Sequence, residues 1–348
     1  MPATPALYQE AIDPGEAQLI DRIVELQRRL HDKGTEPVRR AQHPKHHALA
    51  TGELAVAPGL DDDLRFGLFG ERRSYPAWVR FSNARGVDDA RPGIRGLALK
   101  VTGIDHLGRP DQDFLAIDNQ PFFVKDVQGY INFFEFLDRI SRKSFLGALP
   151  LLAPGLNPSR GVLPTLRRIA RLPRLRGSLL NPTYHSNTPY RLGPAAIKFA
   201  FVPRPINGGE PEPGTSADFL RERLAAHLGN TAAAFDLRVQ FQLDPATMPV
   251  EDATVDWDRA QPPSPWRTVA TLHLPPQVPD SAHRMGLAEN LSFDPWHTLE
   301  AHRPIGGVNR ARKPVYDALS RDRVEANGLS EPAMPPISPL TRDWPTIA

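Results

Sequence analysis

Residues 312–323 read RKPVYDALSRDR, and this stretch carries the strongest indication of the chain's architecture. On a helix that begins after Pro314, Tyr316 and Arg323 are seven positions apart and lie on nearly one face, and Arg312 precedes the tyrosine by four positions. A guanidinium stabilises a phenolate, and a phenolate is a hard anionic ligand for ferric iron. Taken alone, however, the stretch is better interpreted as an ordinary amphipathic helix with a half-buried tyrosine.

The composition of the 348 residues is typical of a folded globular protein, with 40% hydrophobic and 24% charged residues. The absence of cysteine excludes disulfides, thiolate ligands, iron–sulfur clusters and thiol nucleophiles. The net charge of +2 gives no argument for a nucleic-acid partner. No stretch reaches the roughly 18 apolar residues of a membrane span, and the N-terminus lacks a secretory signal pattern. We therefore expect a cytoplasmic protein with no integral membrane span.

Apolar-rich runs bounded by turn residues predict the strands of an antiparallel sheet or barrel. They span residues 48–56, 77–82, 96–103, 113–117, 195–202, 236–243 and 267–274. The 38 prolines favour short strands and irregular segments over long helices. An α+β fold is therefore expected, and the alternating βα units of a parallel nucleotide-binding sheet are not apparent.

Helical spacing of apolar residues predicts an amphipathic helix over residues 16–33, ended by Gly34, and a second helix over residues 127–149. Residues 150–183 lack a clean period and are predicted to form a long wrapping segment, and residues 203–214 a loop. The domains expected are an N-terminal helical arm, one α+β domain and a Pro-rich C-terminal tail, at residues 1–36, 37–328 and 329–348.

Two further motifs lie upstream of Tyr316. Three histidines, two arginines and a lysine crowd into residues 39–47, RRAQHPKHH, and a neutral imidazole is both a metal ligand and a proton shuttle. In residues 113–126, DFLAIDNQPFFVKD, a predicted strand ends at a polar pair that two phenylalanines follow. An amide at such a position can bind a peroxide or a water. In isolation, the first motif is typical of a solvated basic turn and the second of an aromatic core.

In their order along the chain, these three motifs resemble the heme catalases and their smaller catalase-related relatives. The resemblance covers about residues 37 to 325. The matching segments are Arg40-Ala-Gln-His43-x-Lys45, Val79-Arg80-Phe81-Ser82, Arg95-Gly96-Leu97-Ala98-x-Lys100, Phe122-Phe123-Val-Lys-Asp126, Glu289-Asn-Leu-Ser-Phe-Asp-Pro and Arg312-x-x-x-Tyr316-x-x-x-x-Arg321-x-Arg323.

The resemblance implies a heme b whose iron is ligated by Tyr316. It further implies that Arg312 lowers the basicity of this ligand. Arg40, Arg80 and Arg323 are implied to contact the heme propionates.

On the other side of the heme, the resemblance implies a distal histidine, His43, as acid and base, held by the hydroxyl of Ser82. A distal asparagine, Asn119, is implied to steer the peroxide. Phe123 and Tyr130 are implied to lie against the heme, Tyr130 at the position of the family's heme-stacking phenylalanine.

Departures from the family pattern leave two assignments open. The segment His43-Pro-Lys-His-His47 carries about one residue more than the family has before the next strand, so His47 is a rival for the distal role. A β-bulge can absorb the insertion, and His43 is preferred because it keeps the spacing from Arg40. Counted back from the two phenylalanines, the family's distal asparagine falls on Asp118 rather than on Asn119.

The fold implied is a catalase-like antiparallel β-barrel with surrounding helices and long wrapping segments. The function implied is that of a heme-dependent hydroperoxidase, acting on hydrogen peroxide or on an organic or fatty-acid hydroperoxide. Two alternatives stay open: a non-catalytic heme-binding or sensing protein, and a ligand-binding barrel without heme. Residues 160–176 are interpreted as a solvated basic surface, with peripheral lipid contact as the alternative. The unmatched arm and tail suggest wrapping of a neighbouring subunit in a homo-oligomer.

Overall fold

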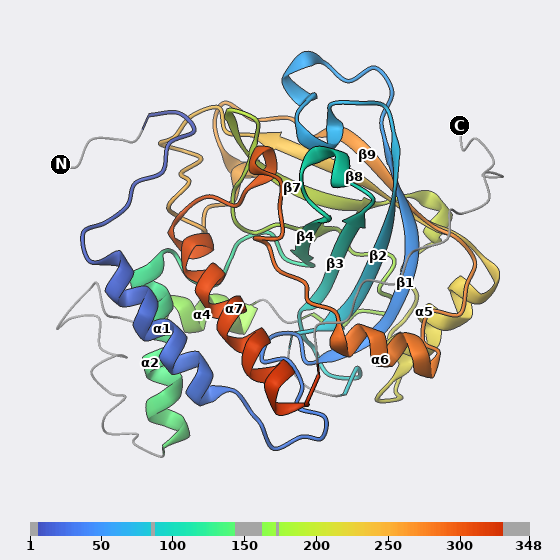
Figure 1. Cartoon of the computed structure of the whole chain (residues 1–348), viewed down its shortest axis with the longest axis horizontal. Coiled ribbons are helices and arrows are strands. Elements are labelled where there is room, and N and C mark those ends of the chain that lie inside the picture. Colours follow the sequence, from blue (N-terminus) through green and yellow to red (C-terminus); the bar gives the residue numbers. More distant parts are fainter. Residues whose placement is uncertain (1–5, 85–87, 143–161, 172–173, 330–348) are drawn as a thin grey trace.

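An antiparallel β-barrel forms the centre of the structure, a computed structural model that describes residues 6–84, 88–142, 162–171 and 174–329 (Figure 1). Its strands are β1 (Lys45–Val56), β2 (Ser74–Asn83), β3 (Arg95–Thr102), β4 (Asp111–Ile117), β5 (Tyr184–His185), β6 (Tyr190–Leu192), β7 (Ala195–Pro203), β8 (Ala233–Phe241) and β9 (Arg267–Leu274). They pair in the order β5-β4-β3-β2-β1-β9-β8-β7-β6. Because β5 also pairs with β7, a ring of eight strands closes and β6 extends from β7.

Successive side chains along each strand point alternately into the barrel and to its outer face, and this decides which of them fill the barrel. In β2, Val79 and Phe81 are buried in the main apolar cluster, while Arg80 and Ser82 point to the opposite face. Phe81 packs edge-on or tilted against Tyr184 and Phe235 from distant strands. Burial of one such phenylalanine contributes about 1.5–3 kcal/mol to folding. The barrel interior is therefore a packed core, and polar chemistry is left to the outer face.

The register of the strands places one row of residues across the outer face of the barrel. Antiparallel pairing sets His46 opposite Ser82, Ser82 opposite Gly96, and Gly96 opposite Ile117. Paired residues project their side chains to the same face of a sheet. This row therefore brings together segments that the sequence keeps apart.

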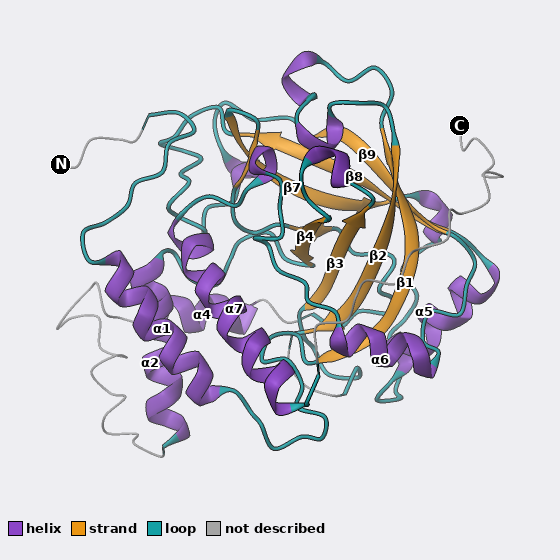
Figure 2. Ribbon diagram, in the orientation of Figure 1, coloured by secondary structure: helices purple, strands orange, loops and turns teal. Residues whose placement is uncertain are grey.

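Helices lie around the lower part of the barrel in the view of Figure 2. They are α1 (Glu16–Leu30), α2 (Val127–Ser141), α4 (Leu163–Arg171), α5 (Phe219–Asn230), α6 (Ala282–Asn290) and α7 (Gly307–Ala326). Helix α1 packs against α2 and α7 in a second apolar cluster, and α6 and α5 pack against β1. The N-terminal helix is therefore part of the packed body of this chain.

The barrel and most of its predicted strands are confirmed. Strand β9 has the predicted bounds, whereas β1 begins three residues earlier than predicted and the short strands β5 and β6 were not predicted. The N-terminal helix ends at Leu30 rather than at Gly34. Of the second predicted helix, residues 127–141 are helical, and its end falls outside the described residues.

Two predictions were wrong. The helix that carries Tyr316 begins at Gly307, so Pro314 lies inside it. It begins early because carboxylates from Glu10 and Glu251 accept hydrogen bonds from the N–H groups of Gly306 and Gly307. Part of the segment predicted to wrap without a regular period, residues 150–183, is instead the helix α4, whose Leu166 and Ile169 pack against the second apolar cluster. The predicted C-terminal tail lies almost entirely outside the described residues.

Within the described ranges, no helix combines the length and the apolar character needed to cross a membrane.

Candidate functional site

His43 lies on the outer face of the barrel, just before β1, and Ser82 and Gly96 hold its ring. Its Nδ1 is 3.0 Å from Ser82 Oγ. A Cβ added at Gly96 would lie 2.6 Å from the Nδ1 and Cε1 atoms of His43, so the imidazole occupies the space that a side chain would need. The backbone of His43 has φ of 54°, in the left-handed region, and Arg80 Nη2 donates to its carbonyl at 2.8 Å. The ring is therefore held in a single, enforced position.

The surroundings of His43 keep its imidazole neutral. Burial lowers its pKa to about 3, and the positive charges of Arg80 and Arg312 act in the same direction. A neutral imidazole has one ring nitrogen that accepts a proton, and in the tautomer whose Nδ1–H donates to the Ser82 hydroxyl that nitrogen is Nε2. This histidine is thus prepared to take up a proton.

His47 belongs to a different cluster on the other face of β1. It is the extra residue of a β-bulge between His46 and Ala48, which absorbs the insertion seen in the sequence. Its Nε2 is 2.8 Å from Asn83 Oδ1, and Asp89 binds the side chains of both Asn83 and Lys45. Burial lowers the pKa of His47 to about 4. The bulge therefore directs His43 and His47 to separate surroundings.

Arg40 and Arg323 lie near the C-terminal end of α6, and the charge of Arg80 acts on the same group. Arg40 donates from Nη2 to the carbonyls of residues 288, 289 and 291 at 2.8–3.0 Å. Arg323 donates to the Glu289 carbonyl and lies 3.9 Å from the Glu289 carboxylate. Burial would raise the pKa of Glu289, but His46, at 3.2 Å, and Arg40 bring it down to about 2. Glu289 is thus a buried anion beside these cations.

Arg40 and Arg80 carry positive charge that the described residues do not neutralise by direct ion pairs. Both are buried, and burial lowers the pKa of Arg40 to about 10, with the charge of Arg323 contributing. The pKa of Arg80 is lowered by burial and by Arg40. Neither has a carboxylate within 4 Å in the described ranges, and the Nε of each lacks a hydrogen-bond acceptor there. Two buried cations of this kind could bind a ligand with two negative charges.

Helix α7 places Arg312 beside Tyr316, one turn apart. Arg312 Nη2 donates to Tyr316 Oη at 3.2 Å, and the guanidinium carbon is 5.3 Å from the centre of the phenol ring. Burial lowers the pKa of Arg312, but the phenols of Tyr316 and Tyr190 raise it above its ordinary value. No carboxylate of the described ranges lies within 4 Å of this guanidinium. The phenol is therefore the group best placed to balance its charge.

Aromatic side chains of α2 and the preceding turn lie in the same apolar cluster as Tyr316. The ring of Phe123 is 6.1 Å from that of Tyr130 and 5.1 Å from that of Phe133. Tyr130 is buried, its hydroxyl is 3.4 Å from Gln27 Nε2, and burial raises its pKa to about 12. Phe123 and Tyr130 are thus brought together on the side of the site where Tyr316 lies.

Asp118 and Asn119 follow β4 at the end of the barrel, and both are bound by neighbouring groups. Asp118 accepts from the N–H of Arg95 at 2.9 Å and from Arg176 Nε at 3.1 Å. Asn119 donates from Nδ2 to the Pro121 carbonyl at 2.6 Å. Burial raises the pKa of Asp118, against the effect of the Arg95 N–H and Arg176. Asp118 is thus engaged in a buried ion pair.

Sequence reasoning missed roles for Gly96, His46, Glu289 and Asn309. Gly96 and Glu289 were quoted within matching segments, but their contacts depend on strand register and on the docking of α6. His46 stands in the inserted segment, where the family pattern offers no counterpart. Asn309 lies outside every motif, and its contacts become visible only in the folded helix.

Comparisons with known proteins show similarity in sequence and in fold. No family model matches the chain. It is 29% identical over 284 residues to a catalase-related peroxidase of Mycolicibacterium paratuberculosis. The matched region covers 76% of this chain and 80% of that relative. Its fold is similar to that of a fungal catalase, with a TM-score of 0.62 and 17% identity over 93% of this chain and 67% of that one. Catalase A from Saccharomyces cerevisiae gives a TM-score of 0.59, 16% identity and the same coverages. The chain thus spans about two thirds of the length of these catalases.

Proposed function

We propose that this chain, which is similar in sequence to a catalase-related peroxidase and in fold to catalases, is a heme-dependent hydroperoxidase in which Tyr316 ligates the iron as a tyrosinate. The observation that carries the proposal is the buried Arg312, which donates to Tyr316 Oη and has no carboxylate within 4 Å in the described ranges. A buried cation is stabilised by an anionic partner, and a tyrosinate at position 316 would be that partner.

The arginines fit the charge of a heme. A heme b carries two propionates, and Arg40 and Arg80 are two buried cations with unused Nε donors. Arg323 is the third arginine of the group and is already close to Glu289. Charge-assisted, bidentate bonds to carboxylates favour arginine over lysine at such positions. Phe123 and Tyr130 would contribute apolar contacts to the macrocycle.

When bound, the heme supplies a redox-active ferric iron at which the peroxide O–O bond is cleaved. His43 contributes the proton transfers. Its Nε2 would accept the proton of the bound hydroperoxide and return it to the oxygen that leaves as water or as an alcohol. Ser82 Oγ would hold Nδ1 and thereby keep the orientation of the ring.

His43 takes this role in our proposal in preference to His47. His47 Nε2 is committed to Asn83 within a buried cluster that also contains Asp89 and Lys45. Asn119 is the proposed source of the distal amide, because the carboxylate of Asp118 is held by Arg176 and by the N–H of Arg95. The substrate proposed is hydrogen peroxide or an organic hydroperoxide.

The axial ligand is tested by absorption spectroscopy of protein loaded with heme. Tyr316→Phe is expected to lose or shift the Soret band, because the phenolate oxygen is removed. Tyr75→Phe is the matched control, since this buried tyrosine donates to the Leu68 carbonyl inside the barrel. A Tyr316→Phe spectrum identical to that of the unaltered protein would refute the assignment.

Turnover is tested on the same heme-loaded protein. Oxygen release from hydrogen peroxide, oxidation of a peroxidase dye, and consumption of a fatty-acid hydroperoxide are measured in parallel. His43→Gln is expected to slow whichever reaction occurs by about 100-fold or more, the contribution of a positioned acid and base. A heme-loaded protein that is inactive in all three assays would instead be a heme binder or sensor.

A further inference from the structure

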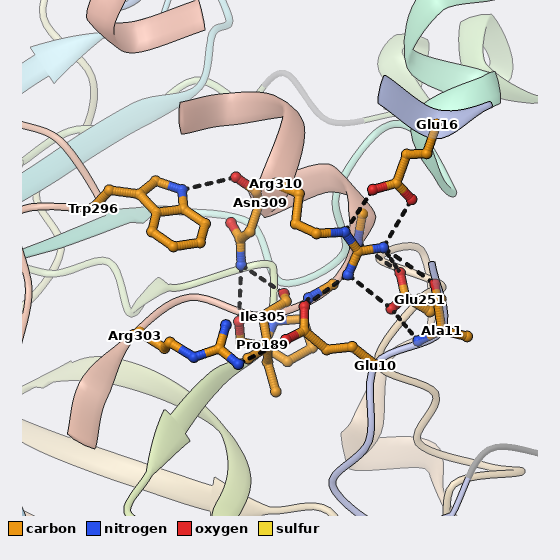
Figure 3. A network of polar contacts seen from close by, with 12 residues as sticks. Glu10, Ala11, Glu16, Pro189, Glu251, Trp296, Arg303, Ile305, Asn309 and Arg310 are labelled. Carbon is orange, nitrogen blue, oxygen red and sulfur yellow. Dashed lines mark hydrogen bonds and ion pairs between the residues drawn. The ribbon is translucent and has the colours of Figure 1, made fainter. Parts of the chain in front are cut away.

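Asn309 and Thr188 lie behind Arg312, on the side of its guanidinium that faces away from Tyr316. Asn309 is in the first turn of α7 and is fully buried, with a relative exposure of 0%. Thr188, with 1% exposure, comes from the segment between β5 and β6. Figure 3 shows Asn309 with several of its partners around the start of α7. Neither residue belongs to a motif by which the site was predicted.

The hydrogen bonds of Asn309 determine which way its amide faces. Nδ2 donates to the carbonyls of Pro189 and Ile305 at 2.8 and 2.9 Å (Figure 3). Oδ1 must then point the other way, where it accepts from Thr188 Oγ1 at 3.0 Å and from Arg312 Nη1 at 3.2 Å. Both N–H groups and both lone-pair positions of the amide are therefore used, and a flipped amide would lose four bonds.

The orientation of the Asn309 amide also determines which nitrogen of the planar Arg312 guanidinium faces Tyr316. With Nη1 bound to Asn309 Oδ1 and 3.5 Å from Thr188 Oγ1, Nη2 is the nitrogen that meets the phenol oxygen, at 3.2 Å. The five donors of arginine have a fixed relative geometry, so holding one nitrogen places the other. An amide can do this without charge, whereas a carboxylate at the same place would neutralise the guanidinium.

The turn of α7 that carries Asn309 is itself anchored. The neighbouring Arg310 binds carboxylates from three separate segments, namely Glu10 at 2.7 Å, Glu16 at 2.6 Å and Glu251 at 3.2 Å (Figure 3). The indole of Trp296 donates to the Asn309 carbonyl at 2.8 Å. The position from which Asn309 holds Arg312 is therefore fixed on several sides.

We propose that Asn309, supported by Thr188, is a positioning residue that holds Arg312 against Tyr316 without adding a negative charge of its own. The inference rests on the proposed heme function. The charge of Arg312 withdraws electron density from the ligand oxygen and favours the reduced iron, so the pair raises the ferric/ferrous midpoint potential. Loosening Arg312, or giving it an anionic partner, lowers that potential.

The test is a redox titration of heme-loaded variants. Asn309→Asp is expected to lower the midpoint potential, because it places a carboxylate beside Arg312. Thr188→Val keeps the shape of the side chain and removes one donor to Asn309 Oδ1, so it is expected to lower the potential by a smaller amount. Asn207→Asp is the matched control. Asn207 is also buried, and its amide joins the Leu180 carbonyl to the N–H of Ala234 within the barrel wall.

A purely structural role for Asn309 predicts loss of stability with no change of potential. An unchanged potential in Asn309→Asp, or a shift equal to that of Asn207→Asp, overturns the proposal. If Asn309→Asp does not retain heme, Thr188→Val decides: a lowered potential supports the proposal and an unchanged one overturns it. Failure of the heme function itself appears separately, as an unaltered Soret band in Tyr316→Phe.

Discussion

Substitution of Gly96 by alanine tests the placement of His43 with a single added carbon. The new Cβ would lie 2.6 Å from His43 Nδ1 and Cε1 and 2.9 Å from Ser82 Oγ. Ordinary contacts begin at 3.4 Å, so the ring must retreat by roughly the difference, about 0.8 Å. The φ of Gly96 is not in the left-handed region, so the backbone itself accepts alanine.

The expected cost falls on catalysis more than on folding. A displacement of about 1 Å in a positioned catalytic group can reduce the rate by about 100-fold. Overpacking of this size typically costs about 1–3 kcal/mol of stability, which a folded domain tolerates. Gly96→Ala is therefore expected to fold and bind heme, and to react with hydrogen peroxide about 100-fold more slowly than the unaltered protein.

Stopped-flow measurement of the second-order reaction with hydrogen peroxide, per bound heme, checks this expectation. Gly229→Ala is the matched control, since Gly229 is in α5 and has no heavy atom within 4 Å of an added Cβ. It is expected to keep the full rate and to gain about 0.5–1 kcal/mol of stability from the helix propensity of alanine. A Gly96→Ala rate within threefold of the control would refute the reasoning that His43, in this position, transfers the proton.

Three further outcomes are expected. Arg80→Leu should weaken heme retention by about 10–100-fold, measured as transfer of heme to apomyoglobin, because the free energy of one charge-assisted hydrogen bond is lost. The unfolding midpoint of the heme-free protein should not fall. Unchanged heme retention would contradict the contact of Arg80 with a propionate. The lowered pKa of His43, about 3, means that the unfolded chain binds its proton first as the pH falls from 6.5, so this residue reduces stability by up to about 1.4 kcal/mol per pH unit in that window. His43→Gln should therefore show a shallower loss of urea stability between pH 7 and 5, and equal slopes would exclude this effect. Lys45→Met should cost about 3–5 kcal/mol in the same assay, because Asp89 loses its buried partner; a cost below 1 kcal/mol would rule out that account.

The local sequence pattern was enough to predict the strands and helix faces, because these depend on residues close together in the chain. The runs at 77–82 and 267–274 were predicted as strands because strand formation follows alternation and turn residues. Tyr316 and Arg323 were predicted to lie on nearly one helix face because helical spacing alone brings residues seven apart together, and both lie on α7. Arg312 joins them on this helix only because α7 begins before Pro314. The similarity of the ordered motifs also indicated the barrel before any contact was known.

Only the tertiary structure decided which distant groups meet. Arg40 and the Ala288 carbonyl are 248 positions apart, and the Thr188–Asn309 bond spans 121, so no local rule predicts either contact. The β-bulge at His47 separated two histidines that the sequence left as rivals, because one extra residue reverses the face to which the following side chains point. The early start of α7 likewise required carboxylates from Glu10 and Glu251, far away in the sequence. The sequence thus determined the secondary elements and the kinds of residue available for the site, and folding decided their partners, because charge balance and hydrogen bonding depend on distance in space.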